Sequence, residues 1–420
     1  MGKLLYQVKK FAFALNCFII VYEKKGNDGY KISKNDETYC LHFIGDCYQE
    51  TDERESALQC YKKEMFLIEQ KEANEKYQFE NYRLHYQMYR TMAQLEKWPA
   101  ALNHIKCTIA KFQHSPNNNG RLASHFNEAG QCLCKMKQYD DAKDYFEKSL
   151  EIGKKIGEKL MGTKIAITLD SIAACCFNLG NYTDALRYTG SAVSIQKRVS
   201  KQESVDRVLA SYYYNEGLSL SEIAKCHEAK ASFAEALRIR KMIGEKLMGE
   251  YIAETSNRMG GCCFRLGHYT DAPEYFYSAI SIQKRVSKKE SVDQDLASYY
   301  YKEGLCLSKI GKYNEAKAHV EESLTIRKNI GEKLMGKEIA DTSNWIGQCC
   351  FELGHYTDSL EYFDSAVATQ KSVSKQKSVD QNLASYYYKE GLCLSKIGKY
   401  NEAKARFEES LMIRKKLVRN

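Results

Sequence analysis

Three pairs of adjacent cysteines are the residues of this chain that first suggest metal or redox chemistry. They are Cys175-Cys176, Cys262-Cys263 and Cys349-Cys350, and each pair follows the previous one by 87 residues. Zinc sites and dithiol redox sites commonly use a Cys-x-x-Cys spacing, which this sequence does not contain. A small apolar thiol also suits a tight contact between helices. We therefore interpret the pairs as packing residues and expect no metal site.

A glycine-rich segment, Gly331-Glu-Lys-Leu-Met-Gly336-Lys337, partly matches a phosphate-binding loop. It lacks the Ser or Thr that follows the Lys in such loops, and no strand pattern precedes it. Copies begin at Gly157 and Gly244, so we interpret the segment as a repeated loop between helical hairpins. The nine histidines are scattered, and no catalytic triad or metal-ligand set can be assembled from them. We expect no catalytic residue and no cofactor.

The recurrence of these segments shows an internal repeat. Ala-Ser-Tyr-Tyr-Tyr begins at Ala210, Ala297 and Ala384, again 87 residues apart. Each block of 87 contains two related units of 43 and 44 residues, aligned on one small residue. The aligned positions of the nine units are Ala57, Ala101, Ala142, Ala185, Ala229, Ala272, Ala316, Ser359 and Ala403.

Each unit reads as a pair of helices. In most units a Gly precedes the small residue by twelve, as Gly304 does, and predicts a point where two helices cross closely. An aromatic or apolar residue follows by four, as Phe276 does, on the same helical face. The turn Leu266 to Asp271 contains a Gly that can end one helix and a Thr or Asp that can cap the next.

Composition agrees with an all-α fold that remains free of disulfides. Only 3 Pro occur in 420 residues, and 63 Lys and Arg against 54 Asp and Glu give a formal charge of +9 without a basic run. Most of the sixteen cysteines fall on positions predicted to be buried on helices, which suits free thiols in a reducing compartment, so we expect a cytoplasmic protein. The apolar run Phe11 to Tyr22 is too short to span a bilayer, and we expect a helix docked on the array rather than a targeting segment.

The small residue, the aromatic at plus four, the Gly at minus twelve and the Gly-x-Tyr turn together resemble the tetratricopeptide repeat, whose usual period is about 34 residues. The longer units, with segments such as Ala236 to Lys241 and Ile252 to Asn257, are similar to kinesin light chain and nephrocystin-type arrays. The resemblance covers roughly residues 38 to 418. It implies a right-handed superhelical solenoid of about nine hairpins over 38–420, preceded by an N-terminal helix and linker over 1–37, and a concave groove lined by the first helix of each hairpin.

In such a groove, the resemblance assigns partner contacts to certain positions of the first helices. An Asn can hold a peptide backbone because its amide both donates and accepts, and a Tyr offers a large contact surface with a polar tip. The predicted partner-binding groove residues are Asn127, Tyr214, Asn257, Arg258, Tyr301, Lys302, Asn344, Tyr388 and Lys389. The adjacent Tyr300 and Tyr387 are expected to face the core.

We therefore expect a non-catalytic scaffold or adaptor that binds peptide or helical segments of other proteins in the concave groove, in a cargo-adaptor or a sensor-array role. The alternative is an RNA-binding helical repeat, suggested by the positive charge, although nucleic acid is not the partner that the dispersed charge favours. No membrane span is expected. Because the ninth hairpin has no polar cap after Leu417, we expect either end-to-end self-association or that this chain belongs to a longer array.

Overall fold

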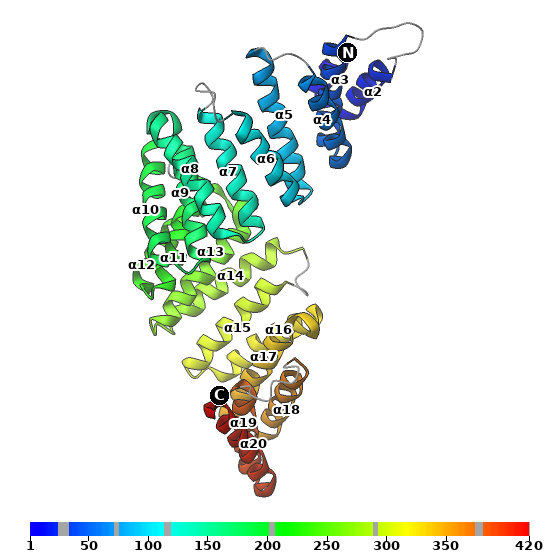
Figure 1. Ribbon diagram of the computed structural model, residues 1–420. Helices are drawn as coiled ribbons and strands as arrows, with labels where there is room; N and C mark the ends of the chain where they lie inside the picture. Colours follow the sequence, from blue (N-terminus) through cyan, green and yellow to red (C-terminus); the bar gives the residue numbers. More distant parts are fainter. Residues whose placement is uncertain are drawn as a thin grey trace. The chain divides into compact units, whose positions relative to one another are not determined.

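The computed structural model describes residues 1–23, 33–70, 75–112, 119–200, 206–288, 293–373 and 381–419. These residues form twenty helices and no strand (Figure 1). The helices are α1 (Gly2–Gln7), α2 (Phe11–Glu23), α3 (Lys34–Glu50), α4 (Arg54–Glu69), α5 (Glu75–Gln94), α6 (Trp98–Phe112), α7 (Asn119–Lys135), α8 (Tyr139–Ile156), α9 (Glu158–Asn178), α10 (Tyr182–Val199), α11 (Arg207–Glu222), α12 (Cys226–Ile243), α13 (Glu245–Arg265), α14 (Ala272–Val286), α15 (Gln294–Lys309), α16 (Tyr313–Ile330), α17 (Glu332–Glu352), α18 (Tyr356–Val373), α19 (Gln381–Ile397) and α20 (Tyr400–Arg419).

The helices pack in consecutive pairs, as the repeat predicted. Apart from the nine repeat units, the chain divides into two compact units, a first unit Met1–Val199 and a second unit Ser200–Asn420. Within each of these two, a helix packs mainly on its neighbours in sequence. From α3 onward, the small residue that marks each hairpin lies on the second helix of a pair. The prediction of an all-α array of helical hairpins is confirmed. The predicted boundary after residue 37 falls inside α3.

The recurring spacing of a Gly and an aromatic or apolar residue inside most repeat units brings two helices into close contact. A Cβ atom on Gly130 would lie 2.6 Å from Cε1 of Phe146, and one on Gly304 would lie 2.4 Å from Cγ2 of Val320. Phe146 and Val320 are themselves almost fully buried. The predicted helix crossings at these glycines are confirmed, because only a residue without a side chain fits there.

The turn between α13 and α14 differs from its prediction in one respect. Gly267 ends α13 at φ +78°, and His268 N donates to Cys263 O at 2.9 Å, as expected for a glycine helix end. Asp271 stands at the N-cap of α14 but makes no side-chain cap, and its carboxylate instead accepts from Thr270 Oγ1 at 3.1 Å. The predicted Thr or Asp cap is therefore wrong at this turn.

The segment Gly-Glu-Lys-Leu-Met-Gly is not a loop, which corrects the sequence prediction. Gly157 alone connects α8 to α9, at φ +104°, and the following residues are the first turns of α9. A Cβ on Gly162 would lie 2.6 Å from Cγ1 of Val199, so the second Gly lets the start of α9 approach the end of α10. Gly244 and Gly331 make the same one-residue connection.

The adjacent cysteine pairs pack between helices, as interpreted from their spacing. All six thiols are buried, and Cys263 lies in a cluster with Phe276 and Cys306. Within the described ranges, no group of three or more His, Cys, Asp or Glu residues could hold a metal ion.

The apolar N-terminal run forms α2, which docks on the first hairpin. Ala14 and Phe18 of α2 pack against Cys40 and Ile44 of α3. Elsewhere one helix among the described residues, α9, is long and apolar enough to cross a membrane by length and composition alone. Over half of the apolar stretch of α9 is buried inside the protein, as in the core helix of a globular fold.

Candidate protein-binding surfaces

A cavity of about 250 Å³ opens in the unit Met1–Val199, among helices α5, α7, α8 and α9. Its volume lies below the roughly 300–1,000 Å³ of typical small-molecule sites, so it fits one or two side chains better than a cofactor. The lining residues are Tyr86, Tyr89, Ala123, Ser124, Asn127, Glu128, Gln131, Ser149, Gly153, Met161, Lys164, Ile165, Ile167 and Thr168.

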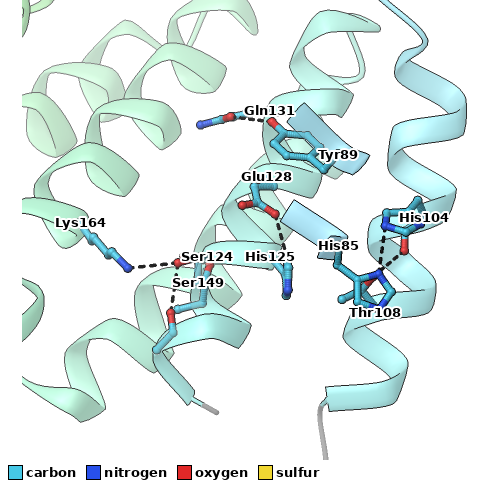
Figure 2. A network of polar contacts seen from close by, with 12 residues as sticks. His85, Tyr89, His104, Thr108, Ser124, His125, Glu128, Gln131, Ser149 and Lys164 are labelled. Atoms are coloured by element: carbon cyan, nitrogen blue, oxygen red, sulfur yellow. Dashed lines mark hydrogen bonds and ion pairs between the residues drawn. The ribbon is translucent and has the colours of Figure 1, made fainter. Parts of the chain in front are cut away.

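Asn127, a predicted groove residue, contributes an unused acceptor to this cavity. Its Oδ1 is buried and has no hydrogen-bond partner. Its polar neighbours are paired: Tyr89 donates to Gln131 Oε1 at 3.1 Å, and Lys164 Nζ donates to Ser124 Oγ at 3.2 Å (Figure 2). A buried acceptor without a donor costs about 1–3 kcal/mol, so a ligand that donates to Asn127 would recover that free energy.

Near the cavity, His85 of α5 contacts His104 of α6 (Figure 2), and the Phe112 ring of α6 lies against the rings of both His85 and His125 of α7. His85 Nδ1 lies 3.0 Å from His104 Nε2 and 3.1 Å from Thr108 Oγ1, whose hydroxyl donates to His104 O at 2.9 Å. Burial lowers the pKa of His85 to about 3 and that of His104 to about 4, so both rings are neutral near pH 7.

On the α7 side of the same cluster, His125 Nδ1 lies 2.8 Å from the cavity residue Glu128. The cluster therefore connects α5 and α6 to each other and reaches a residue of the cavity wall.

In the second unit, two predicted groove asparagines are each held by a lysine of the next hairpin. Lys302 Nζ donates to Asn257 Oδ1 at 3.0 Å, and Lys389 Nζ donates to Asn344 Oδ1 at 2.8 Å. Burial lowers the pKa of both lysines to about 8. Four predicted residues are thus brought together as two equivalent pairs, and the amide oxygens that were expected to meet a peptide are occupied.

The predicted tyrosines occupy different environments. Tyr214 is 8 % exposed, and its hydroxyl donates to Glu254, which also pairs with Arg258 at 3.6 Å. Tyr301 is partly buried, with the guanidinium of Arg327 at 4.8 Å from its ring. Tyr388 is 43 % exposed.

The neighbouring Tyr300 and Tyr387 are buried, as predicted. Of the predicted groove tyrosines, Tyr388 has the most accessible surface for a partner.

Sequence reasoning did not identify Tyr86, Tyr89, Lys164 or Ile167 as part of a site. A signal was present in the alignment of the units. Tyr89 precedes Ala101 by twelve residues and so stands where most other units have the crossing Gly. Tyr89 instead lines the cavity, and its hydroxyl donates to Gln131 of α7.

Comparison with known proteins agrees with the repeat. Sequence models of the tetratricopeptide repeat match residues 251–329 in one case, and 126–154 and 384–417 in another. No curated protein matches the sequence.

Solved structures with a similar arrangement of helices include the apo form of RapI, at 16% identity and a TM-score of 0.57, covering 90% of this chain and 97% of that one. BtubC (BKLC) from P. vanneervenii has 17% identity and a TM-score of 0.47, with coverage of 56% and 92%. The repeats of a putative kinesin light chain from Podosopora anserina have 15% identity and a TM-score of 0.42, with coverage of 50% and 96%. The predicted resemblance to tetratricopeptide repeats is confirmed.

Proposed function

We propose that this tetratricopeptide-repeat chain is a non-catalytic scaffold that holds an extended segment of a partner protein across the cavity formed by α5, α7 and α9. The buried, unpartnered Oδ1 of Asn127 is the observation that carries the proposal. A backbone N–H of an extended segment is the donor that such an acceptor would meet. The partner segment would supply the missing hydrogen bond to Asn127, and no covalent bond would form or break.

The mouth of the cavity supports a segment of mixed character. Tyr86 is 43 % exposed and Ile167 is 36 % exposed, and both line the cavity. An apolar side chain of the partner would bury against them, while the ammonium group of Lys164 favours a nearby carboxylate. We expect partner segments with an apolar residue next to an acidic one.

The test uses the full chain and a displayed library of random peptides. Peptides selected by the wild-type protein should lose roughly tenfold in affinity, about 1–2 kcal/mol, when Asn127 is replaced with Ala. The control is Asn178→Ala, because Asn178 is an exposed asparagine on α9 outside the cavity. Equal affinity for all three proteins would overturn the proposal.

A second arm of the same experiment tests nucleic acid. A labelled single-stranded RNA should bind weakly if this function is correct. Tight RNA binding that falls steeply with salt, together with failure to select any peptide, would instead support the RNA-binding alternative.

We also propose that the protein works in the cytoplasm. The sixteen cysteines support this, because all are free thiols and twelve are buried. Free thiols persist in reducing compartments. A secreted location, shown by fractionation of cells that express the tagged chain, would contradict it.

A further inference from the structure

Two cysteines from different helices are in sulfur contact beside the cavity. Cys134 is the penultimate residue of α7, Cys175 lies near the end of α9, and their Sγ atoms are 3.5 Å apart. Cys175 is fully buried, whereas Cys134 is partly exposed. A disulfide has a sulfur separation of about 2.05 Å, so the two atoms need to approach by only about 1.5 Å to be joined.

The two thiols differ in acidity. The hydrogen bond with Cys175 lowers the pKa of Cys134, burial opposes this effect, and the nearby Lys135 lowers the pKa further. The pKa of Cys175 is raised, first by this hydrogen bond and then by burial. Cys134 is therefore the more acidic of the two thiols, and it is also the one that solvent can reach.

The other repeats show that packing does not require a thiol at position 134. The equivalent positions, 87 and 174 residues later, are Ser221 and Ser308, whereas those equivalent to Cys175 remain cysteines, Cys262 and Cys349. The array thus accepts Ser at this place on the first helix. The Cys134 sulfur adds a chemical capability that the equivalent hairpins lack.

We propose that Cys134 and Cys175 form a reversible disulfide when the protein meets a peroxide, linking α7 to α9. The Cys134 thiolate attacks one peroxide oxygen, the O–O bond breaks, and the products are a sulfenic acid and, after protonation, one water. The Cys175 sulfur then attacks the sulfenic sulfur, the S–O bond breaks, and hydroxide leaves as water with the Cys175 proton. Two thiols lose two electrons, and one peroxide becomes two waters.

The link would act on the walls of the cavity. Gln131 precedes Cys134 by three residues on α7, and Thr168 precedes Cys175 by seven on α9, so both cavity residues lie on the faces next to the sulfur pair. A disulfide would fix the spacing of α7 and α9 at this end of the cavity. An effect on partner affinity rests on the proposed function, whereas formation of the disulfide does not.

The experiment treats the full-length protein with hydrogen peroxide, blocks the remaining thiols by alkylation, and identifies linked peptides by mass spectrometry. The wild-type protein should give a Cys134–Cys175 link that dithiothreitol removes. Cys107→Ser, which removes the exposed cysteine, should give the same link. Cys134→Ser, which installs the residue found in the other repeats, should give none.

A second variant traps the intermediate. In Cys175→Ser the resolving sulfur is absent, so Cys134 should accumulate as a sulfenic acid that a cyclic diketone probe labels. The proposal fails if Cys107 is oxidised while Cys134 and Cys175 remain reduced, or if Cys134 links to other cysteines as often as to Cys175. Disulfide formation without any change in peptide affinity would leave the proposal intact and count against the cavity as the binding site.

Discussion

Lys302 and Lys389 should make the stability of the second unit depend on pH. Each is charged in the unfolded chain below its ordinary pKa of 10.5, but in the folded state burial lowers that pKa to about 8. Below pH 8 both states carry the charge, and the folded state bears the full cost of burying it. As pH rises from 8 to 10.5 the folded state loses the proton first, so stability increases, by up to roughly 3 kcal/mol for each lysine.

The measurement is urea unfolding at several pH values between 7 and 10 for the wild-type protein and for the Lys302→Met/Lys389→Met double variant. The unfolding free energy of the wild type minus that of the variant should increase as the pH rises, because the variant has no amine to titrate at these positions. Parallel pH profiles would show that these amines are not desolvated in the folded protein.

The sequence predicted which residues face the core better than it predicted what the groove residues contact. The spacing within a repeat unit predicted that Tyr300, Tyr387 and the crossing glycines are buried. It could do so because every hairpin places the same sequence positions on its core-facing side. The partner of Asn257 is a lysine 45 residues later, on the first helix of the next hairpin. That pairing depends on how far one hairpin is displaced along the next, and local periodicity does not contain this distance.

Two adjacent glycines on α13 test the helix crossing directly. A Cβ on Gly260 would lie 2.8 Å from Cζ of Phe276, whereas one on Gly261 would have nothing within 4 Å. Gly260→Ala should therefore destabilise the protein by about 1–3 kcal/mol through overpacking. Gly261→Ala should stabilise it by about 0.5–1 kcal/mol, because alanine is the better helix former.

Thermal melts of the two single variants give the comparison, with the change at Gly261 as the control for the change at Gly260. Similar shifts of the melting temperature in the two variants would mean that α13 and α14 do not cross at Gly260.

At the level of elements, helix pairs were predictable, and the connection before α9, α13 and α17 was not. The segment Gly-Glu-Lys-Leu-Met-Gly contains two glycines, which favour a loop when read locally. The first is a one-residue reversal with positive φ, and the second makes room for a valine of the following helix. The second role depends on a contact with a residue 37 positions later, at Val199 for Gly162, so the local sequence favoured the wrong structure.

Across the whole chain, the spacing of small residues was enough to predict nine hairpins, but not the two compact units that meet at residues 199 and 200. The repeat period continues unchanged through residue 199, so it gives no sign of this division. The alignment on one small residue reports the phase of each hairpin only.

Self-association of the chain remains a prediction, and the last helix offers a surface for it. Leu411 and Met412 of α20 are 51 % and 52 % exposed, and Leu411 lines the same surface hollow as Tyr400, which is 71 % exposed. If a second copy buries this surface, the mass from light scattering should rise with concentration, and Leu411→Lys/Met412→Lys should abolish the rise. A constant monomer mass for the wild-type chain would contradict the prediction.

The most direct test of the central claim, that a partner segment lies across the cavity of α5, α7 and α9, is site-specific photo-crosslinking to a library-selected peptide. A benzophenone amino acid would replace Ile167 at the cavity mouth or, as the control, Tyr277, which is 65 % exposed on α14 of the other unit. If the partner segment lies there, the probe at position 167 should give a crosslinked product that Asn127→Ala greatly reduces, and the probe at 277 should give little. Equal crosslinking at both positions, or crosslinking at 277 alone, would contradict it.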